Sequence, residues 1–184
     1  MSRWLLVVLA LASCGDKDTD TDTDTDTDTD VDTDTDVDTD TDVDTDVATF
    51  GVMYGDYFIA NTIELVGLSG YTSVTGDLFI DGAVTDISPL WALTTVGGRF
   101  YIQNNAALTS LDGLENLSSV GGSFAITDNY ALTDIAGLSS FATVGENLYI
   151  YDNLVLCQSD VDSFAQSVSV GGQVTNIEPN EPGC

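Results

Sequence analysis

The feature that most constrains the fold is a degenerate repeat of about two dozen residues, which fills the C-terminal three quarters of the chain. Its five copies begin at Gly55, Gly76, Gly98, Gly122 and Glu146. These starts are 21, 22, 24 and 24 residues apart, and 26 residues separate Glu146 from Gly172. Repeats of this size build solenoids, because each unit can bury its apolar side only against its neighbours. The sequence therefore predicts a stack of about five repeats.

Each repeat opens with a short strand pattern, in which the first and third side chains point to the same side. Two apolar columns result: Leu78, Phe100, Phe124 and Leu148, and Ile59, Ile80, Ile102, Ile126 and Ile150. Stacked in register, these strands predict a parallel sheet, one strand per repeat, with both columns in the core. A second apolar pair follows, such as Leu108 and Leu111, and then a Gly-Leu-x-x-Leu-x-x-Val-Gly segment. This segment predicts a short helical or 3₁₀ turn before the next strand.

Polar residues in the repeats also recur at fixed places. Asn105, Asn129 and Asn153 each follow a strand, and we expect their amides to satisfy backbone groups at a corner rather than contact a ligand. The last repeat departs from the pattern at Ser159-Asp-Val-Asp162, which is typical of a capping box. It predicts a C-terminal capping helix that continues to about Val168.

The segments Leu108–Gly122 and Leu132–Leu138 carry a resemblance to a known family. They resemble the receptor L-domain type of leucine-rich repeat, found in insulin and epidermal growth factor receptor ectodomains, with related versions in exported bacterial proteins. The likeness covers about residues 55–184 and is weaker in the first two repeats, whose segment after the strand is two residues shorter. It implies a mainly β, right-handed β-helix-like or leucine-rich solenoid of about five rungs, with a parallel sheet and a short capping helix. It also implies a binding or adhesion module, and it brings no catalytic residue.

Residues 1–13 have the pattern of a signal peptide, with Arg3 before the apolar segment Leu5–Ala12. That segment is too short to span a bilayer, which takes about 20 residues. It runs into Leu11-Ala12-Ser13-Cys14, which resembles the lipobox of bacterial lipoproteins. The resemblance implies cleavage before Cys14 and acylation of that residue, whereas the alternative is an ordinary secretory signal that happens to contain a cysteine. We expect a lipid-anchored protein of the bacterial cell envelope, at the outer membrane or cell surface in preference to the inner membrane.

The chain contains three cysteines, an odd number for an exported protein. If Cys14 is acylated, Cys157 and Cys184 remain as a pair, and a disulfide between them would close the C-terminal cap. The alternative is two free thiols, which an oxidising exterior disfavours.

The charge of the chain is extreme and unevenly placed. There are 31 acidic and three basic residues, for a net charge of −28, and 16 acidic residues occupy every even position from Asp16 to Asp46. Self-repulsion keeps such a run extended, so residues 14–47 are predicted to be a disordered tether and residues 48–184 the repeat domain. Weak, diffuse binding of divalent cations and O-linked sugar on the threonines are alternative roles for the tether. Nucleic acid is excluded as a partner, because the chain has no cationic footprint.

The middle residue of each strand is predicted to point away from the core. The outward row is Phe58, Phe79, Tyr101, Ala125 and Tyr149, and Gln103 and Tyr151 lie two residues further along the same face. We refer to Phe58, Phe79, Tyr101, Tyr149 and Tyr151 as the aromatic face and predict that it binds a surface glycan or protein. The alternative is a row that only stacks on itself and stabilises the fold.

Two further positions are predicted to lie on the surface. Arg99 lies beside Asp77 in the aligned repeats, which predicts an ion pair between them. Trp91 occupies an exposed turn position and marks a possible second contact patch.

Catalysis is disfavoured by the composition. The chain has no histidine, which excludes Ser-His-Asp chemistry, Cys-His chemistry and histidine-ligated metals, and we predict no metal and no cofactor. Asp77 and Asp81 share one strand face, but glycosidase chemistry also needs a cleft around two carboxyl groups. The predicted function is a non-catalytic binding module on a tether. Its alternatives are a structural spacer or envelope-coat protein without a discrete ligand and, more remotely, a carbohydrate-active β-helix enzyme.

Overall fold

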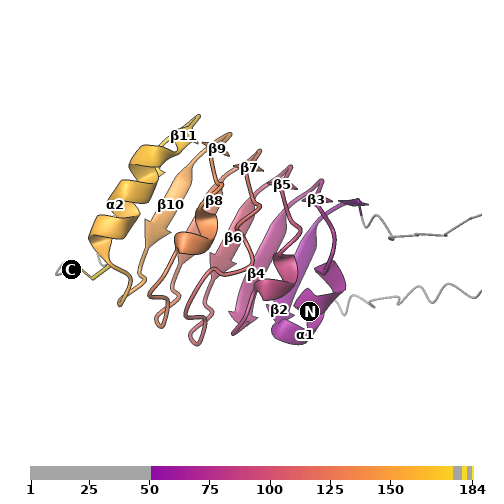
Figure 1. Ribbon diagram of the computed structural model, residues 1–184, viewed down its shortest axis with the longest axis horizontal. Coiled ribbons are helices and arrows are strands. Elements are labelled where there is room, and N and C mark those ends of the chain that lie inside the picture. Colours follow the sequence, from indigo (N-terminus) through magenta and orange to yellow (C-terminus); the bar gives the residue numbers. More distant parts are fainter. Residues whose placement is uncertain (1–50, 176–179, 182–183) are drawn as a thin grey trace, which may run out of the picture. The chain divides into compact units, whose positions relative to one another are not determined.

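The computed structural model describes residues 51–175, 180–181 and 184. The predicted signal peptide, Cys14 and the acidic tether lie outside the described residues. The described part is mainly β, with two parallel sheets of six strands each and few helices (Figure 1).

The first sheet, which we call the long-strand sheet, carries the strand pattern of the repeats. It contains β2 (Tyr57–Asn61), β4 (Leu78–Ala83), β6 (Phe100–Gln103), β8 (Phe124–Thr127), β10 (Leu148–Tyr151) and β12 (Val174–Thr175). Neighbours in this sheet are one repeat apart in the sequence. Leu78 pairs with Phe100, Phe100 with Phe124, and Phe124 with Leu148, so the predicted register is confirmed. All nine residues of the two predicted apolar columns are buried.

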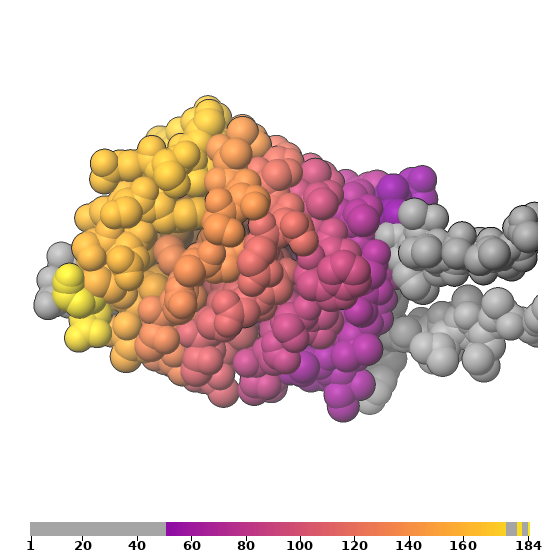
Figure 2. Space-filling model, viewed as in Figure 1, coloured from indigo at the N-terminus to yellow at the C-terminus, as the bar shows by residue number. Residues whose placement is uncertain are grey.

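The second sheet, the short-strand sheet, was not expected from the sequence, which predicted only one strand per repeat. It contains β1 (Val52–Met53), β3 (Ser73–Val74), β5 (Thr95–Val96), β7 (Ser119–Val120), β9 (Thr143–Val144) and β11 (Ser169–Val170). Each strand has two residues, which is too short for an alternating pattern to be recognised. The valines of β3, β5, β7 and β9 are buried and form a third core column. Figure 2 shows the repeats as successive bands packed directly on one another.

Short helical turns lead from the long-strand sheet towards the short-strand sheet. They are α1 (Thr62–Leu65) and the 3₁₀ helices η1 (Val66–Leu68), η2 (Ser88–Leu90) and η3 (Ala136–Leu138). The predicted 3₁₀ turn is therefore confirmed in three repeats. In the shortened first repeat, α1 buries Leu65 and leaves Ile63 85% exposed. Asn61 caps α1 by accepting a 3.0 Å hydrogen bond from the Glu64 N–H.

The predicted C-terminal helix is α2 (Gln158–Ser167), but the predicted capping box is wrong. The helix begins two residues earlier than a capping box at Ser159 requires, so Ser159 lies inside its first turn, and the N-cap is Cys157, whose side chain makes no capping hydrogen bond. Cys157 is held there by a parallel bridge to Glu181. Ser159 Oγ instead lies 3.1 Å from Cys157 Sγ. The sulfurs of Cys157 and Cys184 are 2.08 Å apart, the distance of a disulfide bond.

The predicted asparagine corner is confirmed and forms a continuous ladder of side-chain hydrogen bonds. The Oδ1 atoms of Asn105, Asn129 and Asn153 each accept from a backbone N–H of the preceding repeat, at 3.1–3.2 Å. Their Nδ2 groups donate to the carbonyls of Ile80, Ile102 and Ile126, each at 2.9 Å. All three asparagines are fully buried. From the second repeat onward, the ladder fixes the point where the chain leaves the long-strand sheet.

Candidate functional site

The structure places all five residues of the aromatic face on the long-strand sheet. Because the isoleucines of this sheet point into the core, the residues that alternate with them point outward. Phe58 pairs with Phe79 and Phe79 with Tyr101, after which Tyr101 pairs with Ala125 and Ala125 with Tyr149. Gln103, Thr127 and Tyr151 form the next outward row, again in direct register. One face of the long-strand sheet thus carries both predicted rows.

The aromatic face is open to solvent. Phe58 is 71% exposed, and the other four aromatic residues are half-buried. In the described part of the segment before β2, β1 does not cover them, because it pairs with β3 in the short-strand sheet. Tyr54, directly after β1, is 79% exposed. The described residues therefore leave these rings accessible to a ligand.

The first three rings of the row pack on one another. The rings of Phe58 and Phe79 are stacked, with centroids 4.7 Å apart. Phe79 and Tyr101 meet edge to face at 5.3 Å. Such aromatic pairs each stabilise a protein by about 0.5–1.5 kcal/mol beyond area burial. This half of the row matches the self-stacking alternative.

The row is interrupted at Ala125, and the interruption creates a depression. Its lining residues are Tyr101, Gln103, Ala125, Thr127, Tyr149 and Tyr151, around a volume of about 240 Å³. Ala125 was expected to be exposed with the rest of the row, but it is only 5% exposed, because larger side chains flank it on both neighbouring strands. The depression was not expected from the sequence, in which Ala125 is simply one member of the outward row. The sequence signal for the depression is Ala125 itself, a small residue in an outward row of otherwise large aromatic ones.

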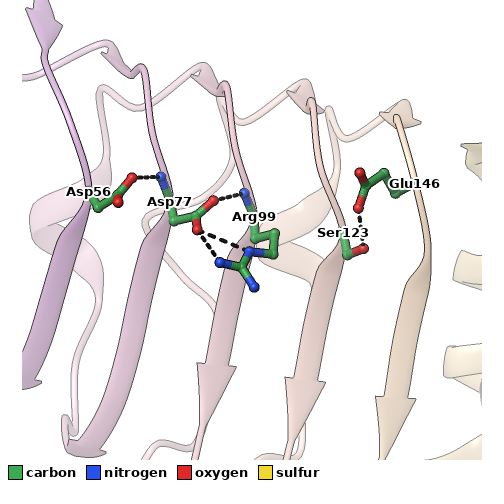
Figure 3. Close-up of polar contacts among 5 residues, drawn as sticks. All are labelled: Asp56, Asp77, Arg99, Ser123 and Glu146. Carbon is green, nitrogen blue, oxygen red and sulfur yellow. Dashed lines mark hydrogen bonds and ion pairs between the residues drawn. The ribbon is translucent and has the colours of Figure 1, made fainter.

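Polar side chains line the start of the long strands (Figure 3). Asp56 Oδ1 accepts from the Asp77 N–H at 2.8 Å, and Asp77 Oδ1 accepts from the Arg99 N–H at 2.7 Å. Asp77 Oδ2 receives the Arg99 guanidinium through Nε at 3.0 Å and through Nη2, which confirms the predicted ion pair. Ser123 Oγ donates to Glu146 Oε2 at 2.9 Å. Each carboxylate in this column thus has a partner in an adjacent repeat.

The ion pair between Asp77 and Arg99 shifts the pKa values of both groups beside the aromatic face. Hydrogen bonds from the Arg99 side chain and backbone lower the pKa of Asp77 below its ordinary value. The same contact raises the pKa of Arg99, whose guanidinium carbon lies 5.4 Å from the Phe79 ring centroid. Arg99 is the only basic residue in the described part of the chain, and Asp77 neutralises it. No unpaired positive charge is therefore available to an anionic ligand in that part.

Asp77 and Asp81, the two carboxylates that share one strand face, each contact a neighbouring repeat. A general acid needs a raised pKa, whereas that of Asp77 is lowered. Asp81 accepts hydrogen bonds from Gln103 and Asn104, at 2.7 and 2.9 Å. Both carboxylates thus have structural partners. No group of three or more metal-ligating side chains is found within the described residues.

Two other surface features lie away from the sheet. Trp91 is 57% exposed at the end of η2, as predicted, and is not brought together with the aromatic face. A larger hollow of about 730 Å³ lies between η3 and α2, next to Phe141 and Phe164 (Figure 2). None of the described helices is long and apolar enough to cross a bilayer.

Comparison with models of known protein families and with curated proteins finds no match. The function must therefore be inferred from the site itself.

Proposed function

We propose that this chain is a lipid-anchored protein of the bacterial cell envelope that presents a non-catalytic recognition module on an acidic tether. The module is a right-handed, β-helix-like solenoid similar to the receptor L-domain repeats. Two observations support the solenoid: successive repeats supply one strand to each of two parallel sheets, and the apolar columns run through all repeats. Repeat arrays of this kind present a broad surface suited to binding.

The open aromatic face is the observation that carries the proposal. Phe58 is a large hydrophobic side chain that is 71% exposed, so most of its apolar surface remains in contact with water in the isolated protein. Rings of this kind are typical anchors of recognition surfaces. The ligand of the face is a surface glycan or a surface protein. The tether predicted for residues 14–47 agrees with this proposal, because a charged, extended linker would let the module reach a partner away from the membrane.

A structural role is the second candidate function, and the stack of Phe58, Phe79 and Tyr101 favours it. In this alternative, the domain is a spacer or coat component without a discrete ligand. The rings then contribute only to stability.

Substituting two tyrosines separates these functions. In Tyr101→Ala/Tyr149→Ala, we expect the full-length chain, solubilised in detergent, to lose its ligands on a glycan array and in a cell-surface pulldown by at least about tenfold in affinity. The fold is retained, because neither side chain belongs to the buried core. Tyr54→Ala is the matched control, since Tyr54 is exposed outside the long-strand sheet. A screen that finds no ligand distinguishing the wild type from the double variant would favour the structural role.

The anchor is tested separately. Labelled fatty acid is expected to enter the wild-type chain expressed in a bacterium and to be absent from Cys14→Ser. Acyl chains bind membranes through about 0.8 kcal/mol per buried CH₂, so the variant is also expected to leave the membrane fraction. Cys157→Ser is the control, because that cysteine lies at disulfide distance from Cys184 and should not affect labelling. Equal labelling of wild type and Cys14→Ser would contradict the lipid anchor.

A further inference from the structure

The depression over Ala125 differs in chemistry from the rest of the aromatic face. Its floor is a small methyl group, and aromatic rings line it from both neighbouring strands, β6 and β10. Its volume of about 240 Å³ lies below the roughly 300–1,000 Å³ of sites for drug-sized ligands. A space of this size fits a single ring rather than an extended side-chain cluster of a protein partner.

The polar groups around the depression are numerous for so small a space. Gln103, Thr127 and the hydroxyl groups of the three tyrosines lie among its lining residues. Within residues 51–175, 180–181 and 184, the Tyr149 and Tyr151 hydroxyls have no hydrogen-bond partner. These hydroxyls both donate and accept, so they suit a ligand that itself carries several hydroxyl groups.

The absence of charge among the lining residues disfavours both anionic and cationic ligands. None of the six lining residues is charged, and the nearest acidic residue in the same strand row, Asp81, is already hydrogen-bonded to Gln103. An anionic ligand would meet a strongly acidic protein with its only nearby cation paired to Asp77. A quaternary ammonium ion would suit the aromatic rings but would leave the surrounding hydroxyl and amide groups without partners.

From this arrangement we infer that the depression binds one ring of an uncharged carbohydrate. An apolar face of the sugar ring packs on the tyrosine rings and the Ala125 methyl group. The hydroxyl groups of the sugar form hydrogen bonds with the tyrosines, Gln103 or Thr127. This inference rests on the proposed recognition function and names the ligand class of the same face. The small residue that interrupts the aromatic row is then the feature that creates the binding site.

The test uses full-length protein labelled with 3-fluorotyrosine and observed by ¹⁹F NMR. The probes are cellohexaose, maltohexaose, chitohexaose and mannohexaose, each titrated to millimolar concentration. At least one is expected to shift the Tyr149 and Tyr151 signals while leaving the Tyr54 signal unchanged. Tetramethylammonium and oligogalacturonate serve as cationic and anionic probes. Both are expected to leave the Tyr149 and Tyr151 signals unchanged.

Two variants test the geometry. Ala125→Tyr fills the depression and is expected to weaken binding of the active hexaose at least tenfold, while extending the aromatic row. Tyr149→Phe/Tyr151→Phe retains both rings and the fold but removes two hydroxyl groups, so it is expected to weaken binding by about threefold to tenfold. Tyr54→Ala, at an exposed position outside the long-strand sheet, is expected to bind like the wild type.

The outcomes distinguish this inference from the recognition function on which it rests. Absence of a shift with all four hexaoses overturns it, as does undiminished binding in both the Ala125→Tyr and the double phenylalanine variants. If a cell-surface ligand is lost in Tyr101→Ala/Tyr149→Ala but is unaffected by Ala125→Tyr and by all hexaoses, the carbohydrate inference fails and the recognition function stands. If no ligand distinguishes any variant from the wild type, both fail.

Discussion

Replacing Asn129 with alanine is expected to lower the free energy of unfolding by about 3 kcal/mol or more, because each buried polar group left without a partner costs roughly 1–3 kcal/mol. The substitution removes the acceptor of the Asn105 N–H, at 3.1 Å, and the donor to the Ile102 carbonyl, at 2.9 Å. Asn129 is fully buried, so solvent at the surface does not replace these bonds. Urea unfolding followed by circular dichroism measures the loss.

Asn116→Ala is the matched control for this prediction. Asn116 is exposed, and its Nδ2 group donates to the Trp91 carbonyl at 2.7 Å. Water can replace that bond, so the control is expected to cost at most about 1 kcal/mol. Equal losses in the two variants would show that the ladder contributes no more than a surface hydrogen bond.

The asparagine ladder illustrates what the repeat pattern could predict. Asn105, Asn129 and Asn153 recur at the repeat interval, so their shared structural role followed from the sequence. Asn180 continues the ladder by accepting from the Asn153 N–H at 3.2 Å, and the sequence analysis missed it. It lies 27 residues after Asn153, because α2 and the C-terminal segment intervene, and it therefore falls outside the regular interval.

The long-strand sheet was predictable for a similar reason, and the short-strand sheet was not. Three or four residues with alternating burial are enough to indicate a strand that recurs in every repeat. A pair such as Thr95–Val96 is too short to show alternation. It becomes a strand only because neighbouring repeats offer a similar Ser-Val pair in register. The pairing of such a short strand depends on the neighbouring repeats and is not visible in the sequence of a single repeat.

The candidate site was predicted in part. The column of aromatic residues is visible in the aligned repeats, and so is the ion pair between Asp77 and Arg99. The depression depends on how much the side chains beside Ala125 shield it, which requires the register of β6, β8 and β10 and the sizes of the neighbouring residues. A binding position on a repeat protein can thus arise from the departure of one residue from its column.

Replacing Gly145 with alanine is expected to destabilise the protein, because the backbones of successive repeats approach closely at this position. A Cβ atom at this position would overlap the carbonyl oxygen of Gly121 in the preceding repeat, and that oxygen belongs to the backbone and cannot move aside alone. The Gly145 N–H donates to the Val120 carbonyl at 2.9 Å, so moving the chain away would also weaken this bond. We expect a loss of about 3 kcal/mol in the free energy of unfolding, at the upper end of overpacking penalties, because the neighbour is rigid.

The control for this prediction is Gly67→Ala, measured by the same urea unfolding. Gly67 lies in η1, and no atom would lie within 4 Å of an added Cβ atom there. Its replacement restricts the unfolded chain without a clash, so it is expected to stabilise the protein by about 0.4–1 kcal/mol. If the free energy of unfolding falls in Gly145→Ala and rises in Gly67→Ala, close backbone contact between repeats, rather than glycine content as such, explains why position 145 requires glycine. A Gly145→Ala protein as stable as the wild type would mean that the repeats can move apart without losing stability. Their spacing would then not be fixed by this contact.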